Sequence, residues 1–261
     1  MAVTSARSIV NIKEKGHFEH DNARINKYTL ADELPAKLSE LELRPRAMAK
    51  PGYTLCALSA DDKDAVIDFL RRFFFRDEPL NQTINLLETP ESRCLELEDY
   101  AASTLHDGVS VAAIDDNGDF VGVVINGIVK REDVDYTDKS EECPHPKFKR
   151  ILKLLGHLDR EARIWDKLPK ECHTVMEVRI ASTHSGWRGR GLMRILCEES
   201  ERIAREVGAG AMRMDTTSAF SAAAAERLSY RSVYGILYKE LSYAPHPPPP
   251  HLEARVYIKE L

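Results

Sequence analysis

The sequence predicts an α/β fold in which a central mixed sheet of about seven strands is flanked by helices. Segments in which every second residue is apolar alternate with longer segments of helical periodicity. One expected hairpin and several expected helical crossovers join the strands, which implies both antiparallel and parallel neighbours. Of the 261 residues, 43% are hydrophobic and 30% charged, a composition typical of globular proteins.

The domain organisation follows from a change in composition near residue 50. Residues 1–50 mix charged residues with few aromatics and end in a basic stretch that contains proline. We expect them to form an N-terminal extension, and we expect residues 51–261 to form one domain.

The expected domain begins with a strand and a helix. Tyr53–Leu58 reads as a short strand, and Ser59 with the acidic residues after it suits the start of a helix. A stop near Pro79 is expected because proline disfavours helical backbone in the residue before it. The residues at helical spacing are Val66, Phe69, Leu70, Phe73 and Phe74.

A second helix and a hairpin should follow. The helix is expected at Ser92–Leu105, with an inward face of Leu95, Tyr100 and Ala101. Two apolar strands, Val109–Ile114 and Phe120–Val129, flank the sequence DDNGD, and an Asn-Gly pair between such strands is a strong hairpin signal.

The second half alternates helices and strands. We expect a polar loop at Asp133–Cys143, an amphipathic helix at Lys147–Trp165 and a strand at Thr174–Ile180. A long helix carrying Leu192, Leu196, Ile203 and Val207 should end at Gly208. The remaining elements are expected at Ala211–Thr216 (strand), Ala219–Leu228 (helix), and Arg231–Leu241 and Ala254–Ile258 (strands), with the stiff loop HPPPPH between the last two.

Charge and cysteine usage exclude several classes of function. The net charge of −5 lacks the basic excess that neutralises nucleic-acid phosphates, so no nucleic-acid partner is expected. The five cysteines include no CxxC pair, which predicts free thiols in a reducing compartment. The histidines are not spaced as the ligands of a metal site usually are, so no bound metal ion is expected. No signal-like or membrane-length apolar run is present, so a cytoplasmic protein that does not bind membranes is expected. We also expect it to be a monomer.

Glycines and arginines lie between the expected strand at Thr174–Ile180 and the long helix. Glycine allows a tight turn with open N–H groups, and the start of a helix attracts anions such as a pyrophosphate. Arg188 and Arg190 add positive charge. The alternative interpretation is an ordinary strand-to-helix turn that only needs glycine.

The segment from Arg188 to Met193, RGRGLM, resembles the acetyl-CoA motif R/Q-x-x-G-x-G/A of the GNAT superfamily of N-acetyltransferases. Met193 stands where the family has a small residue. The resemblance covers roughly residues 53 to 260 in the order of elements. It implies a GNAT fold for the domain at residues 51–261 and acetyl-CoA as cosubstrate. The implied coenzyme-binding residues are the turn and two residues of the preceding strand whose backbone would pair with the pantetheine arm: Arg188, Gly189, Arg190, Gly191, Leu192 and Met193, with Val178 and Ile180.

Acetylation of an amine requires a base, because a primary amine with a pKa of about 10 is protonated at neutral pH. In FFFRDEPLN, Asp77 and Glu78 follow three phenylalanines, and apolar surroundings raise the pKa of a carboxylate toward the working range of a base. The alternative is an acidic pair on a solvated helix end. The motif resembles a signature of the insect arylalkylamine N-acetyltransferases. That resemblance implies Glu78 as the base and Phe75, Asp77, Glu78 and Pro79 as residues of the amine site. We expect the amine site to draw on the whole segment Phe73–Asn81. The loop at Asp133–Cys143 is a candidate for a further wall of that site.

A second block, DTTSAFSAAAAERLSY from Asp215 to Tyr230, is similar to a segment of the same group. Where many GNAT enzymes have a tyrosine that protonates the thiolate, this chain has Ala225. Ser218 and Ser221 are candidates to hydrogen-bond the coenzyme sulfur or relay a proton. The alternative is that they cap a helix.

The resemblance implies direct acetyl transfer from acetyl-CoA to an arylalkylamine such as dopamine, tyramine, octopamine, serotonin or tryptamine. An agmatine or polyamine N-acetyltransferase would carry the same motifs. The motifs are also compatible with a non-catalytic acyl-CoA-binding module and with a protein acetyltransferase. Aromatic walls would mark an arylalkylamine site, and acidic walls would mark a polyamine site.

Overall fold

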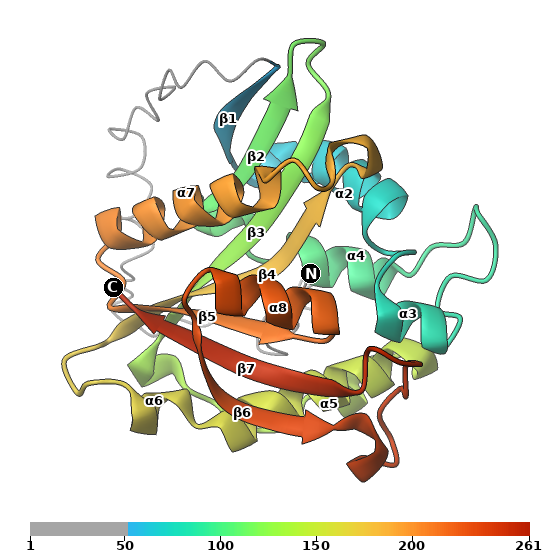
Figure 1. The fold of residues 1–261 in the computed structure, drawn as a ribbon. Helices are drawn as coiled ribbons and strands as arrows, with labels where there is room; N and C mark the ends of the chain where they lie inside the picture. The colour runs from blue at the N-terminus through green and yellow to red at the C-terminus, as the bar shows by residue number, and fades with distance from the viewer. Residues whose placement is uncertain (1–51) are drawn as a thin grey trace, which may run out of the picture.

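The computed structural model describes residues 52–261, so the extension predicted at residues 1–50 lies outside the described residues. A seven-stranded sheet with strand order β1-β2-β3-β4-β5-β7-β6 runs through the domain (Figure 1). Among the strands of the described residues, only β4 and β5 pair in parallel; the other neighbours are antiparallel. The predicted mixed α/β sheet is confirmed. The strands are β1 (Tyr53–Leu58), β2 (Ser110–Asp115), β3 (Phe120–Lys130), β4 (Thr174–Thr183), β5 (Ala211–Thr216), β6 (Arg231–Leu237) and β7 (Glu253–Glu260).

Helices cover both faces of this sheet and enclose two apolar cores. One core packs α7 and α8 against the sheet, and the other packs α2, α4 and α5 against the opposite face (Figure 1). The helices are α2 (Lys63–Phe73), α3 (Pro79–Thr83), α4 (Leu95–Ala102), α5 (Pro146–Ala162), α6 (Ile164–Lys167), α7 (Leu192–Glu206) and α8 (Ala219–Arg227).

The sheet opens in its middle, between β4 and β5. Their parallel pairing covers only Val175–Val178 and Ala211–Met214, although β4 continues to Thr183. On the other side of β4, the register with β3 shifts: Ile180 lies opposite Ile125, and Val178 lies opposite Asn126. One residue of β4, Arg179, is therefore extra at this point, which is a β-bulge. Beyond the bulge the two central strands separate.

Two helices end earlier than expected. The first helix ends at Phe73, and Pro79 begins a new helix, α3, instead of ending the old one. Proline suits the first position of a helix, where the missing N–H would have no partner in any case. The helix expected at Lys147–Trp165 divides at Arg163, whose φ of 43° ends α5 before α6 begins.

The inward face expected for the second helix was wrong at Leu95, which is 57% exposed. The helix begins at Leu95, three residues later than expected, and Leu97 is buried with Tyr100 and Ala101. Leu97, Tyr100 and Ala101 are spaced three and four residues apart and so share one side of the helix. Leu95, two residues before Leu97, points away from that side.

The core under β4 and β5 contains a buried ionic cluster around Arg213. Arg213 Nε and Nη2 each donate to the Asp215 carboxylate at 2.8 Å, and Nη1 donates to Asp159 at 2.7 Å and to Glu177 at 3.3 Å. All four side chains are buried. The cluster joins α5 to β4 and β5 where these two strands still pair, since Glu177 and Arg213 are register partners.

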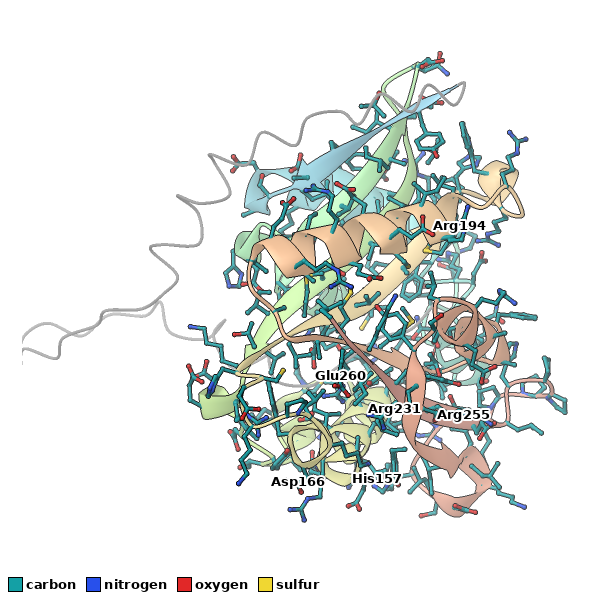
Figure 2. All side chains as sticks on the ribbon, turned by 60° about the vertical axis from the view of Figure 1, so that its left-hand side comes forward. His157, Asp166, Arg194, Arg231, Arg255 and Glu260 are labelled. Carbon is teal, nitrogen blue, oxygen red and sulfur yellow. The ribbon has the colours of Figure 1, made fainter. Side chains whose placement is uncertain are left out.

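The outer strand of the sheet, β6, makes polar contacts with its neighbours at its middle and at its first residue. His157 of α5 lies within hydrogen-bond distance of the Tyr234 hydroxyl on β6, at 3.0 Å, and Arg231 pairs with Glu260 of β7 at 3.6 Å (Figure 2). These exposed or half-buried contacts lie away from the opening between β4 and β5.

Candidate functional site

A cavity of about 540 Å³ lies where β4 and β5 separate. Its walls come from the segment between α2 and α3, the end of β4, the first turn of α7, the start of α8 and the loop before β7. The lining residues are Phe73, Phe74, Asp77, Glu78, Pro79, Gln82, Ala181, Ser182, Thr183, Arg188, Met193, Ser218, Phe220, Ser221 and His251.

Glu78 presents a nearly buried carboxylate to this cavity, with an exposed fraction of 3%. It caps α3: Oε2 accepts a hydrogen bond from the Asn81 N–H at 2.8 Å. Oε1 accepts one from the Thr217 hydroxyl at 2.9 Å. Burial raises the pKa of Glu78, and these hydrogen bonds oppose that rise without cancelling it. A carboxylate in this setting can act as a proton acceptor near neutral pH.

Asp77 has a different environment from its neighbour Glu78. Its side chain is 50% exposed and pairs with Arg188 at 2.5 Å. Arg188 also donates to the backbone carbonyls of Phe73 and Thr183, at 3.2 Å each. Asp77 and Arg188 therefore connect the end of α2 to the glycine-rich turn at the cavity wall, whereas Glu78 is the buried carboxylate.

The glycine-rich turn before α7 is exposed. Gly189 and Gly191 have φ angles of 75° and 79°, and Gly189, Arg190 and Gly191 face solvent. A Cβ at either glycine would meet nothing within 4 Å, so backbone conformation alone explains the preference for glycine there. Open backbone at the start of the 15-residue helix α7 can bind an anion.

The residues that follow the turn divide between core and cavity. Leu192 is buried against the sheet, while Met193 lines the cavity. Arg190 lies over the ring of Trp187, 5.5 Å from its centroid. Arg194, at the same end of α7, points outward and pairs with Glu198 (Figure 2). Three basic side chains, Arg188, Arg190 and Arg194, thus lie near the turn.

The two serines at the start of α8 cap the helix and also line the cavity. Ser218 Oγ accepts a hydrogen bond from the Ser221 N–H at 3.1 Å, and the two hydroxyl oxygens are 2.9 Å apart. The capping interpretation of these serines is confirmed. Ala225, where many GNAT enzymes have tyrosine, is buried.

The two strand residues assigned to the pantetheine arm lie on either side of the bulge. Val178 is the last residue of β4 that pairs with β5, opposite Met214, and Ile180 lies beyond the separation. Both side chains are buried in the core.

The aromatic residues around Glu78 are placed differently from the expectation. Phe75 is buried and is not among the cavity-lining residues, whereas Phe73 and Phe74, from the same expected segment Phe73–Asn81, do line the cavity. Pro79 lines it, as expected of an amine-site residue. The Asp133–Cys143 loop, the candidate for a further wall, contributes none of the lining residues.

Some residues that line the cavity were not predicted: Gln82, Ala181, Ser182, Thr183, Phe220 and His251. Thr217, which bonds to Glu78, was not predicted either. Phe220 is 70% exposed, and its ring centroid lies 5.0 Å from that of His251. His251 Nδ1 accepts a hydrogen bond from the Ala219 N–H at 3.2 Å, which fixes the imidazole against the start of α8. The feature of the sequence that marks His251 is the loop HPPPPH, which ends at this residue.

Cysteines, metal ligands and helix lengths can be assessed within residues 52–261. All five cysteines are free thiols, as predicted. In this range, no group of three or more His, Cys, Asp or Glu side chains is placed to hold a metal ion. Nor does any helix of the described part of the chain have the length and apolar character required to cross a bilayer.

No family model matches the chain, but solved structures do. Arylalkylamine N-acetyltransferase 2 from Aedes aegypti is 32% identical, with a TM-score of 0.73 over 80% of this chain and 98% of that one. A Drosophila melanogaster polyamine N-acetyltransferase that forms N-acetylagmatine is 20% identical, with a TM-score of 0.70 over 80% and 100%. Mosquito arylalkylamine N-acetyltransferase-like 5b is 24% identical, with the same TM-score and coverage.

The matches at 20% and 24% identity establish the fold, and the match at 32% identity establishes membership of the family. Together with the separated central strands and the turn before α7, these similarities show that the chain belongs to the GNAT superfamily of acetyl-CoA-dependent N-acetyltransferases, alongside the insect arylalkylamine N-acetyltransferases.

Proposed function

We propose that this chain transfers the acetyl group of acetyl-CoA to the primary amine of a small arylalkylamine, with Glu78 as the general base. One observation carries the proposal: Glu78 is a buried carboxylate with a raised pKa in a cavity that also reaches Arg188 and Met193 of the glycine-rich turn. A base and an anion-binding turn are thus two walls of one site.

In the proposed reaction, the exposed N–H groups and arginines of the turn hold the diphosphate of acetyl-CoA, which aims the thioester into the cavity. Glu78 takes a proton from the ammonium group of the substrate, directly or through water. The freed nitrogen bonds to the thioester carbonyl carbon, and the carbon–sulfur bond breaks. The nitrogen then sheds its second proton, which neutralises the leaving thiolate. The thiolate leaves toward Ser218 and Ser221. The Ser221 hydroxyl already donates to the Ser218 carbonyl at 2.9 Å, so the Ser218 hydroxyl is the proposed donor to the sulfur.

The walls of the cavity favour an arylalkylamine over a polyamine. Aromatic side chains approach from three segments: Phe73 and Phe74, Phe220, and His251. Among the described lining residues only Asp77 and Glu78 carry carboxylates, and Asp77 is already paired with Arg188. A long polycation would need more unpaired acidic groups than this.

Steady-state assays with acetyl-CoA and matched aryl, guanidino and polyamine substrates test the proposal. We expect the largest kcat/KM for amines such as tyramine, dopamine or tryptamine. A larger kcat/KM for agmatine or spermidine would identify a polyamine-type activity instead. Binding of acetyl-CoA without transfer to any amine would identify a non-catalytic module.

The rate should depend on pH through Glu78. Because burial raises the pKa of Glu78 above its ordinary value of 4.5, the carboxylate takes up a proton as the pH falls through the raised value and can no longer act as a base. We therefore expect kcat to fall on the acidic side, with a midpoint above pH 4.5. A pH series at saturating substrates measures it. An acidic midpoint at or below the ordinary value would contradict the assigned role.

The glycine-rich turn is tested by Gly191→Ala. Alanine disfavours the positive φ of this position by about 1–2 kcal/mol, so we expect acetyl-CoA affinity to fall about tenfold. Gly118→Ala is a matched control, because Gly118 has a φ of 89°, equally open surroundings, and a place in the β2–β3 hairpin. Calorimetric titration with acetyl-CoA should separate the two variants. Equal affinities would show that the turn does not bind the coenzyme.

A further inference from the structure

The carboxylate of Glu78 receives a hydrogen bond from a residue 139 positions away in the chain. Thr217 follows β5 directly, and its side chain is buried. Its Oγ1 lies 2.9 Å from Glu78 Oε1, while the Asn81 N–H occupies Oε2 at 2.8 Å. Each oxygen of the carboxylate therefore has a donor from the protein.

The direction of the bond between Thr217 and Glu78 follows from chemistry. An ionised carboxylate only accepts hydrogen bonds, so the single proton of the Thr217 hydroxyl must point at Glu78. A bond of this kind stabilises the ionised carboxylate and not the protonated acid. It acts against the burial that favours the acid.

Thr217 is itself held in place. The Tyr238 hydroxyl donates to the Thr217 backbone carbonyl at 2.7 Å, and Tyr238, in the 3₁₀ turn Tyr238–Glu240 after β6, is buried. The next residue, Ser218, caps α8. These contacts fix the backbone of Thr217, and burial of its side chain leaves the hydroxyl little freedom to turn away from Glu78.

We propose that Thr217 is a positioning residue for acetyl transfer: its hydroxyl fixes the orientation of the Glu78 carboxylate and keeps it ionised, so that it can take the proton of the amine. Thr217 is not among the cavity-lining residues, so it acts through Glu78 and not on the substrate. The inference rests on the proposed role of Glu78 as base.

The charged or titratable groups near Glu78 have partners of their own. Asp77 is paired with Arg188, the Tyr238 hydroxyl donates to the Thr217 carbonyl, and His251 accepts from the Ala219 N–H. Within residues 52–261, Thr217 is the only side chain that donates to the Glu78 carboxylate, since Asn81 donates through its backbone N–H. Thr217 is therefore the donor that a side-chain substitution can remove.

The test compares Thr217→Val, Thr217→Ser and Thr216→Val. A hydrogen bond to a charged group shifts the pKa of that group by roughly 1 to 2 units. In Thr217→Val, the pH at which kcat falls to half on the acidic side should therefore rise by about that amount. Thr217→Ser keeps the hydroxyl and should restore the wild-type midpoint. Thr216→Val removes a neighbouring hydroxyl, which bonds to the Arg255 carbonyl at 3.3 Å, and should leave the midpoint unchanged. Acetyl-CoA affinity should be unchanged in all three variants. If Thr217→Val does not fold, Thr217→Ala carries the same test.

Glu78→Gln separates failure of this inference from failure of the proposed function. If Glu78→Gln retains wild-type activity, the role of Glu78 as base is wrong. If Glu78→Gln is inactive while Thr217→Val keeps the wild-type midpoint, only the role of Thr217 is wrong. If Thr217 acts through Glu78, Thr217→Val should cause no further loss in the Glu78→Gln background. An additional loss there would overturn the proposal.

Discussion

Replacement of Glu78 by glutamine is expected to lower kcat about 10²–10⁴-fold and to leave acetyl-CoA affinity unchanged. Glutamine has nearly the same shape, but its amide cannot accept the proton of an ammonium group. It can keep both contacts of the carboxylate: its oxygen can accept from the Asn81 N–H, and its NH₂ can donate to the Thr217 hydroxyl, which then acts as acceptor. The variant thus changes the chemistry and preserves the geometry.

The stability of Glu78→Gln shows whether a loss of activity comes from loss of the base or from unfolding of the variant. Because the folded state raises the pKa of Glu78, the ionised carboxylate lowers stability progressively as the pH rises from the unfolded pKa to the folded one. Glutamine carries no such charge. We therefore expect urea unfolding at neutral pH to show a variant at least as stable as the wild type. A stable, inactive variant that binds acetyl-CoA supports the role of Glu78; near wild-type kcat refutes it.

Replacement of Arg213 by leucine is expected to destabilise the domain by about 3–5 kcal/mol. The substitution removes the cation that three buried carboxylates share, those of Asp159, Glu177 and Asp215. Burial already raises the pKa of Asp215 to about 6, with Arg213 opposing the rise. Without Arg213 the carboxylates must take up protons or remain charged and buried. The deficit should therefore shrink as the pH is lowered toward about 5.

The matched control for Arg213→Leu is Arg231→Leu, on the edge strand β6. Arg231 is 57% exposed and pairs with Glu260 at 3.6 Å, and surface pairs of this kind contribute about 0–1 kcal/mol. Urea unfolding of both variants at about pH 5 and pH 7 makes the comparison. Equal, small losses for the two would mean that the buried cluster contributes little to stability.

Much of the fold follows from patterns that are local in sequence. Alternation of apolar residues located β5 at its observed bounds, Ala211–Thr216, and the glycine at 208 ended α7 as expected. Such elements could be predicted because their signals lie within a few residues. Leu95 was misplaced because it lies two residues before Leu97, on the opposite side of a helix whose inward face carries Leu97, Tyr100 and Ala101.

The site was predictable only where its residues lie close together in the sequence. Glu78 could be proposed from its motif, since three phenylalanines and a proline lie beside it in sequence. Thr217 and His251 could not, because their contacts with Glu78 and with the start of α8 join distant segments. Phe75 was expected in the site but is buried in the core, because adjacency in sequence to Glu78 does not show which aromatic rings turn toward the core.

Near the β-bulge at Arg179, the strand pairing in the centre of the sheet is incomplete. Sheets usually pair their central strands along the whole length, yet here β4 and β5 part after four pairs. An extended ligand between the separated ends of β4 and β5 could pair with their free backbone groups. A ligand that binds only the folded chain raises the free energy of unfolding in proportion to the logarithm of the ligand concentration. Substrate supply would then govern how long the enzyme survives heat or proteolysis, as well as how fast it works.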